Sequence, residues 1–124
     1  MEMKFYRCKH CGQIGAVVKA TGAKLVCCGD EMEELVPGMV DASVEKHVPE
    51  FEVVGNTVHV KVGSVEHPMI DAHYIEWVAI QTKFGNQRKA LKPGDKPEVC
   101  FKLCDGDEVI AVLAYCNLHG LWKA

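Results

Sequence analysis

The chain has 124 residues, of which 48% are hydrophobic and 25% are charged, and its formal net charge is -3. This composition is typical of a folded globular protein with one ordinary domain, or with a small domain beside a medium one. The slightly acidic balance argues against a polybasic nucleic-acid-binding surface, and no apolar run is long enough to span a membrane. No apolar segment follows the N-terminus, so we expect a cytoplasmic protein whose seven cysteines bind metal or stay reduced.

Residues 1–36 are predicted to form a small unit with two cysteine pairs. Cys8 and Cys11 form a C-x-x-C turn, and Cys27 and Cys28 are adjacent. Four thiolates from two turns can form a tetrahedral site that suits zinc or iron. A unit this short is expected to draw much of its folding free energy from such a metal. The strands expected here lie at residues 4–7, 13–18 and 24–26.

The adjacent cysteine pair departs from an ordinary zinc ribbon, in which both turns are C-x-x-C. Neighbouring ligands widen the S–metal–S angle and distort the tetrahedron. A C-x-x-C turn followed by a C-C pair resembles desulforedoxin, a small iron protein, and the resemblance covers about residues 4–36. The resemblance implies an Fe(Cys)4 site, although the spacing alone leaves zinc and iron both open.

Residues 37–124 are predicted to be all-β, after a short linker that contains Pro37 and Gly38. Several short strands separated by turn signals favour an immunoglobulin-like β-sandwich, with a small barrel as the alternative. Alternation places Val58, Val60 and Val62 on one face of a strand, and no helical pattern competes. The expected strands lie at 51–54, 57–62, 74–84, 87–91, 99–103 and 108–115, with turns at Gly55-Asn56, Gly85-Asn86 and Asp105-Gly106.

Four histidines and one cysteine of this second domain are predicted to converge on another metal. Cys116 and His119 stand three positions apart, directly after an apolar run. His47 precedes the first strand, and His67 and His73 bracket a loop, so a rigid sandwich could present all five at one edge. Five ligands do not fit zinc, whose sites are almost always tetrahedral. Four imidazoles in a plane with an axial thiolate would leave one position open, which suits one-electron chemistry on a small oxygen species.

Three motifs of this domain resemble those of desulfoferrodoxin, the two-iron superoxide reductase family. They are Glu45-Lys46-His47-Val48-Pro49, His67-Pro68-Met69 with His73 and Ile75-Glu76-Trp77, and Cys116-Asn117-Leu118-His119-Gly120. With the N-terminal cysteines, the resemblance covers nearly the whole chain.

The resemblance implies two iron ions per chain, Fe(Cys)4 and Fe(His)4(Cys). The second would have His47, His67, His73 and His119 as equatorial ligands and Cys116 as the axial ligand. Lys46 would assist the attraction and protonation of superoxide, and Glu45 could occupy the sixth position in the oxidised state. The implied reaction is the one-electron reduction of superoxide to hydrogen peroxide, by a homodimer that receives electrons from rubredoxin or a similar donor.

Two other classes of function remain open on the residues alone. The first is a non-catalytic iron protein that only transfers electrons, which would need a saturated site rather than an open position beside Lys46. The second is an interaction module with a structural zinc finger, which would need only four ligands.

Three more residues are expected to have no part in metal binding. His59 lies in mid-strand and should face outward as a surface residue. Cys100 and Cys104 are four positions apart on one strand, about 13 Å if the strand is extended, which is too far for a disulfide. We expect both to be buried small apolar groups or incidental thiols.

Overall fold

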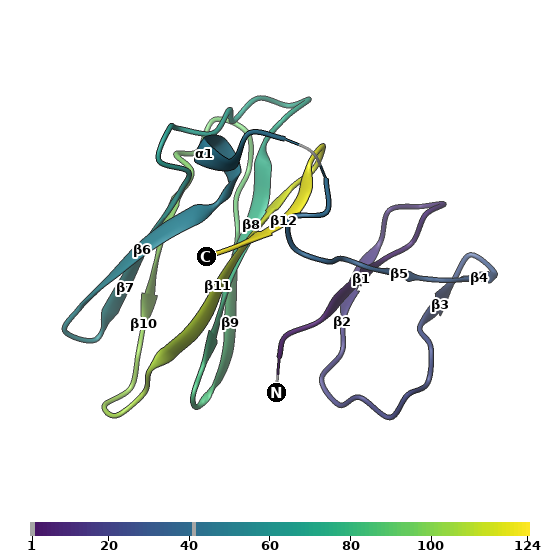
Figure 1. The fold of residues 1–124 in the computed structure, drawn as a ribbon, viewed down its shortest axis with the longest axis horizontal. Helices are drawn as coiled ribbons and strands as arrows, with labels where there is room; N and C mark the ends of the chain where they lie inside the picture. Colours follow the sequence, from purple (N-terminus) through teal and green to yellow (C-terminus); the bar gives the residue numbers. More distant parts are fainter. Residues whose placement is uncertain (1, 41) are drawn as a thin grey trace. The chain divides into compact units, whose positions relative to one another are not determined.

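The chain forms two compact units, Met1–Val36 and Pro37–Ala124, in a computed structural model that describes residues 2–40 and 42–124. Apart from one helical turn, all regular structure in these described residues is β-strand (Figure 1). The prediction of an all-β chain, with a small cysteine knuckle ahead of a β-sandwich, is confirmed. Within the described ranges, no helix is both long and apolar enough to cross a membrane.

The first unit consists of very short strands around little apolar core. Its strands are β1 (Phe5–Arg7), β2 (Ile14–Ala16), β3 (Val26–Cys27), β4 (Asp30–Glu31) and β5 (Glu33–Glu34). One sheet has the order β2-β1-β5, and β3 pairs with β4 in a separate hairpin. Among the described residues of this unit, only Phe5 and Cys8 are buried apolar side chains. Because so small a core rarely stabilises a domain alone, we expect a bound metal to stabilise the unit.

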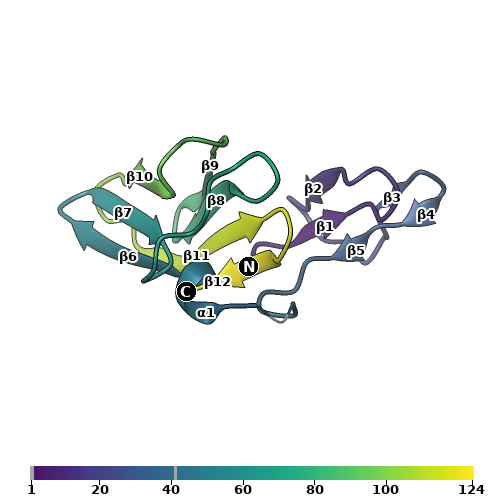
Figure 2. The same ribbon diagram turned by 90° about the horizontal axis from the view of Figure 1, so that it is seen from above.

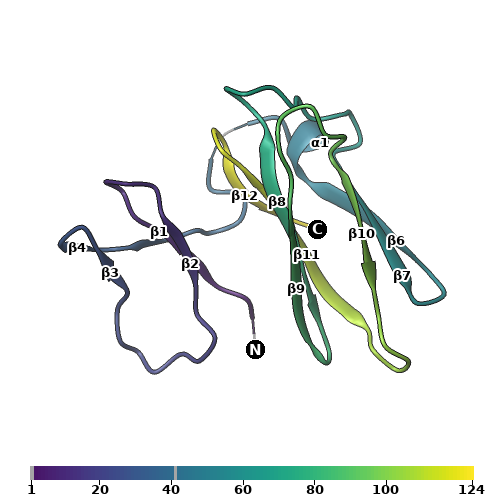
Figure 3. The ribbon, with the colours of Figure 1, turned by 180° about the vertical axis from the view of Figure 1, so that it is seen from behind.

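The second unit is a sandwich of two antiparallel sheets. Its strands are β6 (Pro49–Val54), β7 (Thr57–Val62), β8 (Ile75–Thr82), β9 (Gly85–Ala90), β10 (Glu98–Lys102), β11 (Val109–Cys116) and β12 (Gly120–Lys123). One sheet has the order β10-β7-β6 and the other the order β12-β11-β8-β9. Figures 2 and 3 show the two sheets of this unit from above and from behind.

The core of the sandwich lies between the alternating face of β7 and the buried strands β8 and β11. Val58, Val60 and Val62 are buried, as their alternation predicts, and the two residues between them are exposed. The strands β8 and β11 are buried along almost their whole length, which explains why their sequences are nearly continuous apolar runs. Phe101 of β10 is among the largest fully buried side chains and belongs to the same apolar cluster.

Four elements were not predicted from the sequence, namely one helical turn, the strand β12 and the two-residue strands β4 and β5. A helical turn, α1 (Val44–His47), precedes β6 where no helix was expected, because a single turn is too short to show a helical period. The strand β12 was also not predicted, since it has only four residues and pairs with β11 across the tight turn that follows Cys116. The helical turn and β12 matter for the predicted second metal site, because α1 ends at His47 and β12 begins next to His119.

Of the two alternatives given for Cys100 and Cys104, burial as small apolar groups is wrong, since both residues are exposed. Cys100 follows the alternation of β10 and lies on the outer face with Glu98 and Lys102, while Phe101 points into the core. His59 is exposed on the outer face of β7, as predicted.

Replacing Phe101 by alanine should lower the free energy of unfolding of the second unit by about 3–5 kcal/mol, because the loss leaves a cavity between the sheets. The matched control is Phe84→Ala, whose ring is 60% exposed and whose loss should cost less than about 1 kcal/mol. Urea unfolding of the iron-loaded proteins, followed by circular dichroism, measures both. Equal losses would contradict the placement of Phe101 in the core.

Candidate functional site

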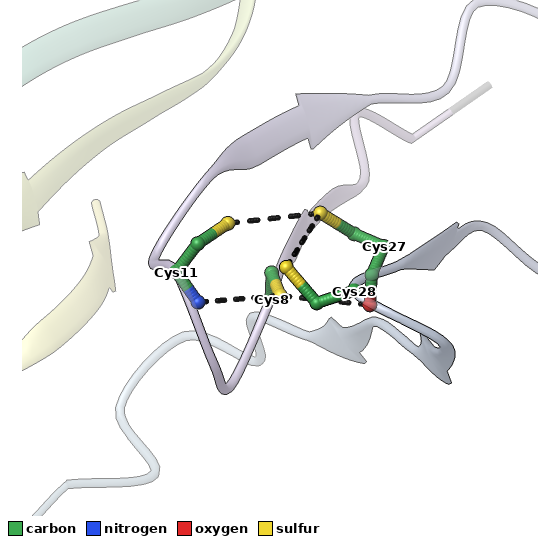
Figure 4. A group of neighbouring side chains, drawn as sticks. All are labelled: Cys8, Cys11, Cys27 and Cys28. Atoms are coloured by element: carbon green, nitrogen blue, oxygen red, sulfur yellow. Dashed lines mark hydrogen bonds between the residues drawn. The ribbon is translucent and has the colours of Figure 1, made fainter.

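The four cysteines of the first unit converge on one point. Cys8 and Cys11 lie in the turn after β1, Cys27 ends β3, and Cys28 begins the turn into β4. Their sulfur atoms all lie within 4.8 Å of one another. The Sγ of Cys27 is 3.6 Å from that of Cys11 and 3.9 Å from that of Cys28 (Figure 4). The predicted grouping of these four residues is therefore present in the structure.

An unusual backbone conformation allows the adjacent cysteines to face the same centre. Successive side chains of a strand point to opposite sides, so Cys27 and Cys28 could not both bind one metal from an extended backbone. Cys28 has a φ of 52°, and no other described non-glycine residue has a positive φ. A left-handed residue of this kind costs of order 1–3 kcal/mol and persists only where its surroundings compensate. The C-C pair thus obtains its geometry at the expense of local strain.

The thiols of this cluster affect one another strongly. The backbone N–H of Cys11 donates to the Sγ of Cys8 and lowers the pKa of Cys8 to about 6. The hydrogen bond with Cys8 is the main cause that raises the pKa of Cys27 to about 12, and the pKa of Cys28 is raised chiefly by its hydrogen bond with Cys11. Without a cation, the four sulfurs therefore cannot all be thiolates near neutral pH. A divalent or trivalent metal would remove this conflict.

The second cluster lies where α1, two loops and the end of β11 meet. His47 ends α1, His73 precedes β8, and Cys116 is the last residue of β11. His47, His67 and Cys116 are buried, and one ligand atom each from these three and His73 fall within 4.8 Å of one another. His119 completes the set, because its Nδ1 is 3.1 Å from the Nε2 of His47 and 3.8 Å from the Sγ of Cys116.

The four imidazole rings stand at the corners of a near-square. Going round from His47 through His67, His73 and His119, adjacent ring centroids are 4.6, 4.7, 4.9 and 4.9 Å apart. Each adjacent pair is close to perpendicular, with interplanar angles between 77° and 89°. The opposite pair His47 and His73 is 6.3 Å apart and closer to parallel, at 28°. The four rings of this pinwheel surround one centre, and one nitrogen atom each of His47, His67 and His73 lies within 4.8 Å of the other two.

Backbone carbonyls set the tautomers of two of these rings. Nδ1–H of His47 donates to the carbonyl of Ser43 at 2.6 Å, and Nδ1–H of His67 donates to that of Pro68 at 2.7 Å. A neutral ring with its proton on Nδ1 has a lone pair on Nε2. The two Nε2 atoms are only 3.1 Å apart, so two lone pairs face each other. This repulsive arrangement is stable only with a cation between them, and hydrogen-bonded ring nitrogens of this kind are typical of metal-binding histidines.

Burial keeps the cluster neutral and ready for a metal. Desolvation lowers the pKa of His67 to about 4 and is the main cause of the lowered pKa values of His47 and His73. The Nε2 of His73 is buried and has no hydrogen-bond partner among the described residues. Burial also raises the pKa of Cys116, whose thiol would become a thiolate on binding a metal ion. The donor atoms present therefore fit a transition metal with five protein ligands.

Two side chains that the sequence analysis did not identify hold this cluster in place. The indole N–H of Trp122 donates to the carbonyl of His119 at 3.0 Å, and its rings lie 5.0 Å from the ring of His47. The amide of Asn117 accepts from the backbone N–H of Tyr74 and donates to the carbonyl of Ala72. Asn117 therefore joins the turn that carries Cys116 and His119 to the loop that carries His73. The sequence offered one signal for the role of Asn117, which is its position within the last of the three motifs.

A glycine fixes α1 against the neighbouring loop. The N–H of Gly63 donates to the carbonyl of Val48 at 3.1 Å, and the φ of Gly63 is 83°. A Cβ at this position would stand 2.5 Å from the carbonyl oxygen of Val65 and 2.7 Å from those of Glu45 and Lys46. Only glycine permits this approach, and the approach sets the position of His47.

The two charged residues named from the sequence lie on α1 beside His47. Lys46 is half-buried, and its charge adds to the effect of burial in lowering the pKa of His47 and of His73. Its ammonium group therefore acts on the ring cluster and not only on solvent. Glu45 is exposed, and a hydrogen bond from its own backbone amide is the main cause of its lowered pKa.

Two family models match the chain, the N-terminal domain of desulfoferrodoxin over residues 1–35 and desulfoferrodoxin over residues 39–124. The chain belongs to the desulfoferrodoxin family. A desulfoferrodoxin of Syntrophotalea carbinolica is 45% identical over 123 residues, which cover 99% of this chain and 96% of that protein.

Two solved structures are also similar to this chain. The crystal structure of the superoxide reductase from Treponema pallidum has a TM-score of 0.85 and 40% identity, and the match covers 100% of this chain and 99% of that one. A superoxide reductase (1Fe-SOR) from Giardia intestinalis has a TM-score of 0.54 and 37% identity, and the match covers 64% of this chain and 95% of that one.

The two clusters match the two iron centres of the desulfoferrodoxin family. The cofactors are therefore two iron ions per chain, one in an Fe(Cys)4 site and one in an Fe(His)4(Cys) site, and the prediction of both is confirmed. The donor sets agree with this assignment, because the first supplies four thiols and the second supplies imidazoles around one buried thiol.

Gly63→Ala should weaken iron binding at the second site by about 10- to 100-fold, because the displaced α1 moves His47 out of the ring. Gly55→Ala is the matched control, since Gly55 also has a positive φ, of 60°, but no atom lies within 4 Å of its Cβ position. Iron analysis after competition with a chelator should find close to two irons per chain in the control and close to one in the Gly63 variant. Equal retention by the two variants would show that the close approach does not position His47.

Proposed function

We propose that this chain is a superoxide reductase, which reduces superoxide with one electron and two protons to hydrogen peroxide. The observation that carries the proposal is the square of four imidazoles closed by one buried thiol, with a lysine beside it. Proteins of similar sequence and structure bear the name superoxide reductase, among them those of Treponema pallidum and Thermococcus kodakarensis. When bound, the iron of the second site supplies the electron that superoxide accepts.

The ligand assignments follow the two clusters. We assign the first iron to the four thiols of the N-terminal unit, and the second to the imidazoles and thiol of the sandwich. The four rings, which lie in a near-square, and the thiol would together hold the second iron. The residues are Cys8, Cys11, Cys27 and Cys28 for the first iron, and His47, His67, His73, His119 and Cys116 for the second.

Lys46 attracts the substrate and gives it a proton. Superoxide is an anion, whereas residues 37–124 carry nine basic and twelve acidic side chains, so the attraction must be local. Lys46 supplies a positive charge on the same helical turn as His47, and that charge acts on the rings. Its ammonium group can donate one proton to the reduced substrate and regain it from solvent. We assign to Glu45, on the same turn, the role of closing the open position after oxidation.

The alternative of a non-catalytic electron carrier is not favoured. A carrier works best with a coordinatively saturated site, whereas five protein donors would leave one position of a six-coordinate metal for the substrate. The family and the similar structures also favour reduction of superoxide.

The donor, the assembly and the compartment are further parts of this proposal. We propose a rubredoxin-like electron donor on the basis of the resemblance to the family. We also propose a cytoplasmic location, on the basis of the same resemblance and of the seven cysteines. We propose a homodimer because Phe51 and Val53 are 43% and 48% exposed, although they share a sheet face with the buried Val60 and Val58. Sedimentation analysis of the iron-loaded protein measures the assembly, and a monomer at micromolar concentration would contradict it.

The stoichiometry of the products tests the activity directly. With a reductant present, each superoxide consumed should give one hydrogen peroxide and no oxygen, whereas a dismutase gives one oxygen for every two superoxides. Cys116→Ser should slow the reaction at least about 100-fold, since oxygen donates less charge than thiolate sulfur. Cys104→Ser changes an exposed thiol and should leave the rate unchanged. Evolution of oxygen, or an unaffected rate in the Cys116 variant, would contradict the proposal.

Lys46→Ala should slow the second-order reaction with superoxide up to about tenfold at low ionic strength, because a steering charge is lost. The rate of the unmodified chain should also fall more steeply with added salt than that of the variant. Lys61→Ala is the control, since it removes an equal charge from the outer face of β7. Pulse radiolysis across a series of ionic strengths measures all three rates, and equal salt dependence would assign Lys46 no role in steering.

A further inference from the structure

The outer face of the β10-β7-β6 sheet carries a third cluster of chemically active side chains. The strand register places Glu52 opposite His59, and His59 opposite Cys100. Residues directly opposite one another have Cβ atoms about 4.5–5.5 Å apart on the same face of a sheet. A carboxylate, an imidazole and a thiol therefore form one row across three strands, and the row shares no residue with either iron site.

The thiol and the imidazole of this row are in contact. Cys100 Sγ lies 3.2 Å from Nδ1 of His59, so the thiol S–H can donate to that nitrogen. Transfer of the proton along this hydrogen bond would give a thiolate beside an imidazolium, and the strand register places Glu52 opposite the same histidine. Lys89 donates to the backbone carbonyl of Cys100. A thiol in hydrogen-bond contact with an imidazole base has the arrangement of an activated nucleophile.

The row is also accessible from solvent through a groove. An open groove of about 440 Å³ runs over this face, and its lining includes all three residues of the row. Glu50, Lys61 and Glu98 form the next row along the same face and also line the groove. The groove is large enough for a small polar molecule to approach Cys100, whose side chain is exposed.

We propose that Cys100 is a peroxide-reactive thiol, activated by His59, and that it is a site of oxidative modification. The thiolate sulfur attacks one oxygen of hydrogen peroxide, an S–O bond forms, and the O–O bond breaks. The leaving hydroxide takes the proton held on His59 and departs as water. The sulfur loses two electrons to the peroxide, and Cys100 becomes a sulfenic acid.

The second exposed cysteine of this region provides an internal comparison. Cys104 is also exposed, but no described residue makes a hydrogen bond with its sulfur. Cys104 lies two residues after the end of β10, so both thiols are exposed to the same solvent. Hydrogen peroxide is the product of the proposed superoxide reductase activity, which would supply the oxidant, yet the reactivity of Cys100 does not depend on that activity.

The test uses the full chain with both irons bound and oxidised, exposed to a small excess of added hydrogen peroxide. Sulfenic acids are labelled with dimedone, and peptide mass spectrometry measures the initial rate at each cysteine. Cys100 should react at least about tenfold faster than Cys104. His59→Asn should bring the rate at Cys100 close to that at Cys104, whereas Cys104→Ser should leave it unchanged. Because the peroxide is added directly, failure of the reductase activity would not affect this result.

Alkylation by iodoacetamide provides a second readout that involves no peroxide and no iron chemistry. It should show the same preference for Cys100 and the same loss of that preference in the His59 variant. Equal rates at Cys100 and Cys104 with both reagents, or an unchanged rate at Cys100 after His59→Asn, would overturn the proposal.

Discussion

The second unit is organised around histidine ring nitrogens whose lone pairs face one another at a site that is largely shielded from water. Carbonyls of Ser43 and Pro68 fix the protons of His47 and His67 on Nδ1, so their Nε2 atoms meet without a proton between them. Desolvation keeps these rings uncharged, and protonation would place positive charges side by side in a poorly hydrated site. A metal cation satisfies every donor at once, which is why the loops and α1 can converge on this point.

The two units of the chain depend on metal to different degrees. The sandwich has an extended apolar core that includes β7, β8, β10 and β11, and its stability does not require the second iron. It therefore carries the five residues of the second cluster on a folded framework, at the ends of strands, in loops and on a single helical turn. The first unit has almost no apolar core, so metal binding by its cysteines must supply the stability that packing does not. Loss of metal should consequently unfold the knuckle and leave the sandwich folded.

Much of this arrangement could be predicted from the sequence, for identifiable physical reasons. Turn residues and alternation located the hairpins, and the clustering of cysteines and histidines located both metal sites. The roles of Gly63 and α1 could not be predicted, because a single helical turn has no period and the contact of Gly63 is with carbonyl oxygens from another segment. For Cys100 the sequence did contain the signal, since it alternates with Phe101. The alternative of a buried Cys100 did not take this alternation into account. The contact between Cys100 and His59 depends on the strand register, which the sequence does not specify.

The contact between Trp122 and His47 has a consequence for observing the protein. The indole lies 5.0 Å from a ring of the second cluster and is hydrogen-bonded to the residue that supplies another. Its fluorescence would therefore be quenched by a transition metal at that centre, through energy or electron transfer over a very short path. The chain carries only one other tryptophan, Trp77, which stacks on Tyr115. The emission of Trp122 thus gives the protein a built-in optical reporter of metal loading, which needs neither an added dye nor an added substrate.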